Sequence, residues 1–273
     1  MNDIVVPPAQ PHLTICSIDA STTASGICLA RCCFYPEDSQ SLTDLLLNLS
    51  TDQAAIEKAV TILHQDEIPV DKELEKALKR CRKTQRETTP TIPLSENLQE
   101  EKLFFSKMNH QVEKIYQVIE RFSEDRIDFI FLEDYAFGAH GSIVQLAEMK
   151  GILKRVLFQA GWLETMRFLT LPVTSIKKIA ATSGNADKPA ICEMMRRFGF
   201  EGYEKLNNQL DAIAMVLTGF YGIYHQMFGL TFPTPSNSKE RAKLKSWRDS
   251  LQVLGSRLGR PDELKQILQK DLS

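Results

Sequence analysis

The sequence has little of three features that would mark a specialised class of protein. Its six cysteines show neither the paired spacing of a zinc site nor that of a disulfide framework. Its apolar runs are shorter than the ~20 residues that cross a membrane, and residues 1–12 lack the basic start and apolar centre of a signal peptide. We therefore expect free thiols in a reducing compartment, and a cytoplasmic protein without membrane spans.

The chain also lacks an excess of charge of either sign. It has 33 Lys and Arg against 35 Asp and Glu, so its net charge of −2 does not attract nucleic acid globally. Any DNA contact must come from a local patch, and two stretches could supply one. Residues 79–86 (KRCRKTQR) hold five basic residues and no acid, and residues 239–248 (KERAKLKSWR) hold five against one. Each is equally consistent with a DNA contact and with a solvated helix face.

Hydrophobic patterning over the 273 residues indicates an α/β fold. Apolar runs of strand type cover residues 13–19, 27–34, 127–132 and 167–171. Helical spacing of apolar residues covers 98–122, 142–160 and 208–228. Because strands alternate with helices in the second half of the chain, we expect a sheet with at least one parallel pair of strands.

Two segments lie outside this alternation. Between residues 35 and 97, apolar residues recur at helical spacing up to Cys81, so we expect a helical insertion, with a proline-bearing return loop over 86–97. Residues 231–273 begin with a linker that holds Pro233 and Pro235. We expect this charged segment to be a C-terminal extension outside the core, and residues 12–230 to form the main domain.

Three acids occupy comparable places in these elements. Asp19 ends the first strand, Glu133 follows a later buried strand, and Asp211 lies near the start of the most apolar helix. Ligands bind at strand ends in open α/β sheets, and buried carboxylates need partners, water or a cation. Mg²⁺ prefers carboxylate oxygens, and two such ions can hold both the attacking water and the leaving oxygen of a phosphodiester. Each acid alone is weak support, because an acid near a helix start is also favoured by the helix dipole.

The ordered set of motifs is more specific than any single acid. The pieces are SIDASTTASG around Asp19, FIFLEDYAFG around Glu133, LAEMKGILKRVL, SIKKIAATSGNADK, and NNQLDAIAM around Asp211. In order and spacing they resemble the RuvC-type Holliday-junction resolvases, including phage relatives, of the ribonuclease H-like class. The resemblance implies a mixed five-stranded sheet flanked by helices, here with the helical insertion and the C-terminal extension.

The resemblance also implies which residues hold metal. Asp19, Glu133 and Asp211 match the metal-binding acids, and Asn208 takes the fourth position, which in the family is usually Asp, His or Asn. An amide offers one neutral oxygen and cannot act as a base. We expect two Mg²⁺ ions in each active site, with Mn²⁺ able to substitute.

Basic and aromatic positions carry over as DNA contacts. Lys177 and Lys188 match two positions that approach the scissile phosphate in the family, and Lys178 lies beside the first. Lys188 thereby joins the three acids in the expected catalytic set. Tyr135 and Phe137 lie in the loop where the family has an aromatic that stacks on a junction base, although a core-facing Phe137 is equally consistent with the sequence.

By resemblance, the chain forms a homodimer that binds a four-way DNA junction in the cytoplasm of a bacterium or a phage-infected cell. Each active site then hydrolyses one phosphodiester with a metal-activated water, so that paired symmetric nicks carry 5′-phosphate and 3′-hydroxyl ends. The basic residues of the insertion could extend the DNA footprint, or the insertion could form a dimer or partner contact. We favour the DNA contact. The basic residues are Arg80, Arg82, Lys83 and Arg86.

Three other interpretations are weighed beside this one. Actin-like sugar kinases and ATPases also end their first strand in Asp, but they need a duplicated domain and a second glycine-rich phosphate loop, and the sequence shows neither. Asn208 keeps open a catalytically weak or inactive protein that binds branched DNA on the same fold. A nuclease for other branched DNA, such as flaps or forks, also fits the residues.

Overall fold

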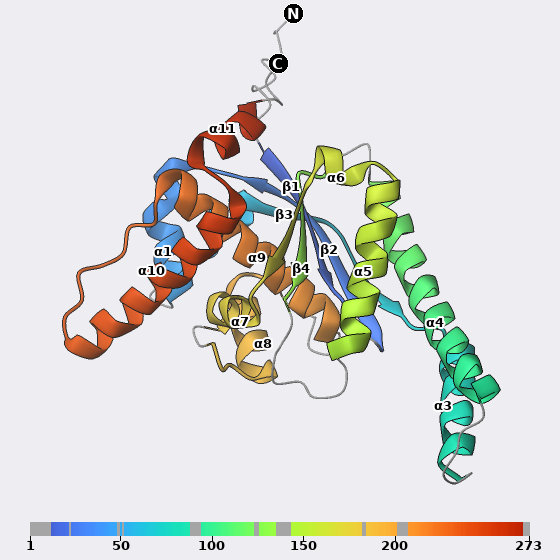
Figure 1. Cartoon of the computed structure of the whole chain (residues 1–273). Coiled ribbons are helices and arrows are strands. Elements are labelled where there is room, and N and C mark those ends of the chain that lie inside the picture. Colours follow the sequence, from blue (N-terminus) through green and yellow to red (C-terminus); the bar gives the residue numbers. More distant parts are fainter. Residues whose placement is uncertain are drawn as a thin grey trace, which may run out of the picture.

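In the computed structural model, a five-stranded sheet forms the centre of the molecule (Figure 1). The structure describes residues 12–21, 23–47, 50, 52–87, 94–122, 126–134, 143–181, 184–200 and 207–269. The strand order is β3-β2-β1-β4-β5. The strands are β1 (His12–Asp19), β2 (Ala24–Cys33), β3 (Val60–Pro69), β4 (Phe129–Glu133) and β5 (Arg167–Leu171).

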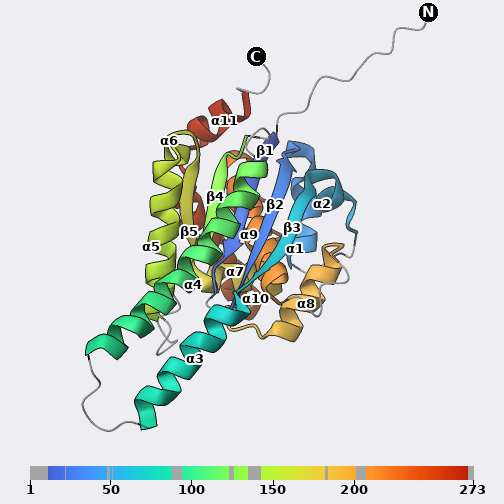
Figure 2. The same ribbon diagram turned by 90° about the vertical axis from the view of Figure 1, so that its right-hand side faces the viewer.

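The sheet is mixed in strand direction. β1 pairs antiparallel with β2, from His12 opposite Cys33 to Asp19 opposite Gly26, and β2 pairs antiparallel with β3. On the other side, β1 pairs parallel with β4 and β4 pairs parallel with β5. With helices on both faces (Figure 2), this is the mixed five-stranded sheet flanked by helices that the resemblance implies.

Helices supply the rest of the regular structure in the described ranges. They are η1 (Pro36–Asp38), α1 (Ser39–Leu47), α2 (Ala54–Ala59), α3 (Lys72–Glu87), α4 (Leu94–Arg121), α5 (Ile143–Gln159), α6 (Trp162–Thr165), α7 (Val173–Ala181), α8 (Lys188–Arg197), α9 (Asn207–Phe228), α10 (Ser238–Leu258) and α11 (Pro261–Gln269). Of the helices that the structure describes, none is both long and apolar enough to cross a membrane.

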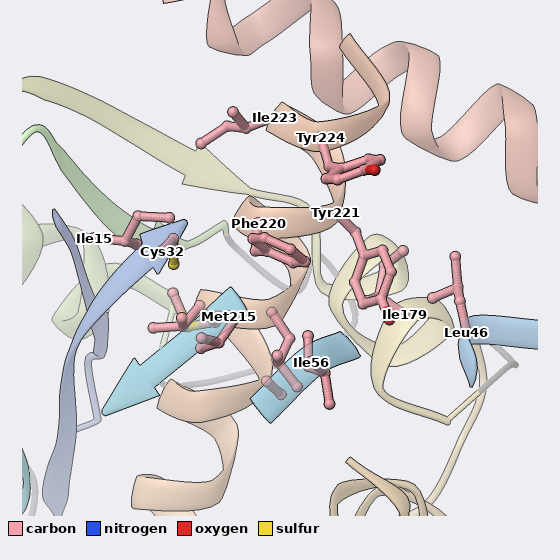
Figure 3. Packing of buried hydrophobic residues seen from close by; sticks show 14 of the residues in the cluster. Ile15, Cys32, Leu46, Ile56, Ile179, Met215, Phe220, Tyr221, Ile223 and Tyr224 are labelled. Carbon is pink, nitrogen blue, oxygen red and sulfur yellow. The ribbon is translucent and has the colours of Figure 1, made fainter. Parts of the chain in front are cut away.

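Each face of the sheet builds its own hydrophobic core, because successive side chains of a strand point to opposite faces. In β1, Ile15 belongs to the core under α9, whereas Cys16 and Ile18 belong to the core under α4 and α5. Figure 3 shows the first core, where aromatic residues of α9 lie among residues from the strands and the outer helices. Phe220 of α9 stacks on Phe34 with 5.3 Å between ring centroids.

Most expected elements are confirmed within a few residues. The strands expected at 13–19, 127–132 and 167–171 are β1, β4 and β5, and the helix expected at 208–228 is α9. The expected loop over 86–97 is shorter, since α3 continues to Glu87 and α4 begins at Leu94.

One expectation within residues 35–97 is wrong. The segment is not purely helical, because Val60–Pro69 forms β3 at the edge of the sheet. Helical spacing is correct for α1, α2 and α3, but the run from His64 to Glu67 between α2 and α3 is too polar to read as a strand. An edge strand needs few apolar residues: in β3 only Val60 and Ile68 are buried, and most of the other residues are partly buried.

The C-terminal segment also departs from expectation. We placed residues 231–273 outside the core, but α10 buries Trp247, Leu251 and Leu254 against the α9 side of the sheet, and α11 buries Leu264. The apolar stripe of α10 is hidden in the sequence because charged residues stand between its members. The segment therefore contributes to folding.

We predict opposite effects of alanine at two helical glycines. In Gly219→Ala, the new methyl group would lie 1.9 Å from a ring carbon of Phe131, and we expect a loss of about 1–3 kcal/mol from overpacking. In the matched control Gly151→Ala, nothing lies within 4 Å, and better helix propensity should add about 0.5–1 kcal/mol. Thermal unfolding of both variants measures this, and a neutral Gly219→Ala would contradict the close packing of α9 on β4.

Candidate metal-binding active site

The start of α9 lies directly against β2. A Cβ atom on Gly26 would lie 1.8 Å from the main-chain oxygen of Asn208, so only glycine allows this approach. The Ser17 hydroxyl donates to the main-chain oxygen of Ala212 at 2.6 Å, which ties the same helix to β1. Because Gly26 is the partner of Asp19 in the β1–β2 ladder, these contacts bring Asp211 towards Asp19.

The three predicted acids converge and repel one another. Asp19 is 7 % exposed, and burial together with the charges of Glu133 and Asp211 raises its pKa to about 8. Burial is also the main cause of the raised pKa of Glu133, followed by the charge of Asp211. These three side chains come from β1, β4 and α9 and are far apart in sequence. They lie together because β1 pairs with β4 and α9 packs on β1.

Lys188 balances part of this negative charge. Its Nζ atom lies 2.5 Å from Oδ2 of Asp211, and its charge lowers the pKa of both Asp19 and Glu133. Lys188 is the first residue of α8, whose start is capped by the Asp187 carboxylate accepting from the Ala190 amide at 3.1 Å. The cap thus places the predicted catalytic lysine beside the predicted metal-binding acid.

Lys150 is a second cation at the site, and we did not predict it as a site residue. It is 3 % exposed on α5, and its ammonium group donates to the main-chain oxygen of Glu133. Burial lowers its pKa, while its charge lowers the pKa of Asp19 and Glu133. The signal in the sequence is a single lysine on the apolar side of α5, between the buried Met149 and Leu153.

A pocket opens onto these groups. Its volume is about 370 Å³, and Glu133 and Asp211 line it together with Lys177 and Lys188. Apolar residues of α7, α8 and α9 complete the wall, among them Ile176. Asp19 is buried and is not among the lining residues, although its pKa is raised by burial and by the charges of Glu133 and Asp211. Asp187 also lines the pocket, but its carboxylate caps α8, so Glu133 and Asp211 are the lining acids without a capping role.

The donor set fits a hard divalent cation. Carboxylate oxygens are the preferred ligands of Mg²⁺, and a cation would relieve the repulsion that raises the pKa of Asp19 and Glu133. Within the described ranges, no three His, Cys, Asp or Glu side chains are placed so that they could hold an ion by themselves. Water and substrate oxygens would have to complete the coordination, which is the usual arrangement for Mg²⁺.

Asn208 lies beside these acids but is occupied elsewhere. Its side-chain amide donates to Oε2 of Glu67 on β3 at 3.3 Å. Glu67 stands opposite Gly26 in the β2–β3 ladder, so the edge strand reaches the same end of the sheet. Glu67 is a further acid near the site that sequence reasoning missed, because we had not recognised the strand that carries it.

Lys178 has a structural partner. Its ammonium group donates to the main-chain oxygen of Ser246 at 3.0 Å, to the Ser246 hydroxyl at 2.6 Å and to the Ser250 hydroxyl at 2.9 Å. These bonds join α7 to α10. Lys177, its neighbour, lines the pocket instead. The structure thus separates two lysines that the sequence placed together.

The remaining predicted contacts lie away from the pocket or outside the described residues. Arg82 pairs with Glu100 at 2.6 Å, so it joins α3 to α4, and Arg80 and Lys83 lie on the same helix. The side chain of Arg86 falls outside the described residues. Tyr135 and Phe137 fall outside them as well.

Gln111 supports the loop between β1 and β2, and we did not predict it. The side chain is fully buried on α4, and its amide donates to the main-chain oxygen of Ser21 at 3.0 Å and to the Ser25 hydroxyl at 2.8 Å. The Ser25 hydroxyl also accepts from the Ser21 amide. α4 therefore holds the turn that follows Asp19.

Similarity to known proteins is limited to structures. No protein-family model and no curated protein matches the sequence. RuvC of Thermus thermophilus is 15% identical with a TM-score of 0.47, over 81% of this chain and 100% of that chain. The same RuvC in complex with a Holliday junction substrate is 17% identical with a TM-score of 0.45, over 77% and 94%. At these values the likeness carries no argument about the chemistry of this chain.

The raised pKa of Asp19 predicts how pH affects stability without metal. Between its ordinary pKa of 3.8 and about 8, the folded protein binds more protons than the unfolded chain, so stability falls as pH rises. Asp19→Asn removes this penalty. We expect the variant to be more stable than the wild type at pH 8, by about 1–2 kcal/mol or several degrees in Tm, and nearly equal at pH 4.

Thermal unfolding in EDTA across this pH range is the measurement. Mg²⁺ should raise the Tm of the wild type at pH 8 and have less effect on Asp19→Asn, because the ion needs the carboxylate. A difference between the two proteins that does not change with pH would show that Asp19 is not held in this environment.

Proposed function

We propose that this protein is a metal-dependent endonuclease that acts on branched DNA, with four-way junctions as its substrate. The observation that supports this is the pocket that Glu133 and Asp211 line together with Lys177 and Lys188, with the buried Asp19 close to both acids. Lys188 pairs with Asp211, so an acid for a divalent cation and a lysine for a phosphate lie side by side in one opening. That is the arrangement that phosphodiester hydrolysis needs.

The bound Mg²⁺ would supply an activated water and stabilise the leaving oxygen, and two ions in each site would do both. Asp19, Glu133 and Asp211 would hold the ions, with Asn208 as the fourth oxygen donor and Mn²⁺ able to replace Mg²⁺. Glu133 is kept in place by Lys150, whose ammonium group binds its main-chain oxygen. The chain thus contributes ligands whose positions are set before substrate arrives.

The two pocket lysines would act on the phosphate. Lys188 is bound to Asp211 in this structure, and a cation on Asp211 would compete with that ion pair and release the ammonium group towards the phosphate. Lys177 lines the same pocket from α7, and a second positive charge would neutralise the other phosphate oxygens. Lys177 of α7 and Lys188 of α8 would thus neutralise the phosphate from two different helices.

The finer assignments extend this proposal. Tyr135 and Phe137 would stack on a base at the junction, and the basic residues of α3 would contact a DNA arm. Two copies of the chain would form a homodimer and place paired nicks symmetrically on the junction. Each nick would leave a 5′-phosphate and a 3′-hydroxyl.

A second function has one observation in its favour. The Asn208 amide is turned to Glu67, which leaves the fourth ligand position engaged with an acid of β3. A chain that binds branched DNA with little or no cleavage is consistent with that contact. The two functions differ in whether Mg²⁺ starts cleavage of a bound junction.

We predict that Asp19→Asn or Glu133→Gln abolishes cleavage of synthetic junctions and leaves junction binding largely intact. The acids hold metal, whereas affinity for DNA comes mainly from basic contacts. Glu113→Gln, which neutralises an exposed acid of α4, is the matched control and should cleave normally. Cleavage of junction, fork, flap and duplex DNA is measured in Mg²⁺, and binding of the junction is measured separately in EDTA. Wild-type cleavage by either site variant would refute the site.

Lys188→Ala and Lys178→Ala should differ in kind. Lys188→Ala should slow single-turnover cleavage by at least tenfold at saturating DNA, because its charge acts where negative charge develops. Lys178→Ala should mainly lower the Tm, because it removes the three hydrogen bonds to Ser246 and Ser250. Cleavage rate and thermal unfolding are measured for both. Equal losses of cleavage rate in the two variants would indicate that any positive charge near the site has this effect, and would contradict a specific role of Lys188.

A further inference from the structure

A row of polar and basic side chains runs along α10 from its contact with α7. Lys239, Lys243, Ser246 and Ser250 follow one another at intervals of four, three and four residues, so they share one stripe of the helix. Ser246 and Ser250 bind Lys178 of α7, which fixes the direction of the stripe. Lys239 and Lys243 therefore lie on the α7 side of α10, one to two turns beyond that contact. We call Lys239 and Lys243 the α10 lysine row.

α10 is held firmly in this position. Trp247, Leu251 and Leu254 are buried against the core. Arg257, near the end of α10, donates to the main-chain oxygen of Thr170 at 3.2 Å and lies 3.8 Å from Asp134, the residue after Glu133. The helix is thus attached beside α7 and at the end of β4, and Figure 1 shows it next to α7. Its basic side chains are presented from a rigid support.

The ammonium groups of the row are exposed, and the nearest acid in the sequence is Glu240, whose pKa is lowered first by its hydrogen bonds to Ser236 and also by the charge of Lys243. Neither lysine makes an ion pair or a side-chain hydrogen bond with any described residue. Glu240, the acid between them, accepts from the amide and the hydroxyl of Ser236 and so holds the start of the helix. Positive charge in this part of α10 is therefore available to an external anion.

We infer that the α10 lysine row binds the phosphate backbone of a duplex DNA arm that leaves the catalytic pocket. The pocket supplies Lys177 and Lys188, α7 adds the charge of Lys178, and the row lies one to two turns of α10 beyond the contact of Lys178. From Ser246 to Lys239 the helix rises about 10 Å, a distance along which a duplex presents several phosphates. The inference rests on the proposed function, because it assigns an arm of that substrate to this helix.

The matched comparison uses the other edge of the same helix. Arg241 and Lys245 are also exposed and lie four residues apart, but their stripe points away from Ser246 and Ser250. We compare two double variants. The row variant combines Lys239→Gln and Lys243→Gln, and the control variant combines Arg241→Gln and Lys245→Gln. Both remove two positive charges from α10, and thermal unfolding confirms that both fold.

Binding is measured by fluorescence anisotropy in EDTA, over a range of salt, with a labelled four-way junction and a linear duplex. For the row variant we expect the slope of log affinity against log salt to decrease by about 1.8, or 0.9 for each phosphate contact. The Arg241 and Lys245 variant should keep the wild-type slope. Shortening the junction arms should reduce the affinity of the wild type and leave the row variant almost unchanged.

An unchanged slope for the row variant, or equal losses in both double variants, would overturn the inference. The proposed function fails separately, if the wild type in Mg²⁺ cleaves no branched DNA. A row variant that binds weakly but cleaves at the wild-type rate once saturated supports the inference, because the row lies outside the pocket. A row variant with normal binding and slow cleavage would contradict it.

Discussion

The close contact between α9 and β2 is the constraint on which the rest of the structure depends. At Gly26 the helix backbone comes so near that only a hydrogen atom fits between them. This approach lets α9 cover the sheet along its length, and its aromatic residues build the core in Figure 3. It also brings Asp211 towards Asp19. The absence of a side chain at Gly26 is therefore required both for the packing of α9 and for the position of Asp211.

The site that results is an electrostatic balance. Three carboxylates repel one another in a poorly solvated place, and the buried Lys150 and the half-exposed Lys188 offset part of that repulsion. A divalent cation would offset this repulsion more strongly than a single lysine, because it carries two positive charges and prefers carboxylate oxygens. The two lysines differ in role. Lys150 is fixed on the main chain of β4, whereas Lys188 holds a side chain that the ion would also bind.

Some basic residues of the helices form contacts within the protein, and others are exposed at its surface. Lys178 and Arg82 form contacts within the protein, where they join α7 to α10 and α3 to α4. The α10 lysine row stays exposed, beyond the contact of Lys178 with Ser246 and Ser250. Basic stretches that look alike in a sequence therefore serve different purposes, and only their neighbours in space separate them. With a net charge of −2, the protein depends on such local surfaces for any attraction to DNA.

The sequence by itself determined the α/β class, four of the strands and the helix that carries Asp211, because buried strands and an apolar helix leave strong periodic patterns. It did not reveal β3, since an edge strand can be mostly polar, nor that α10 belongs to the core. Glu67, Lys150 and Gln111 reach the site only through strand pairing and helix packing. Such partners are far apart in the chain, and the fold alone brings them together.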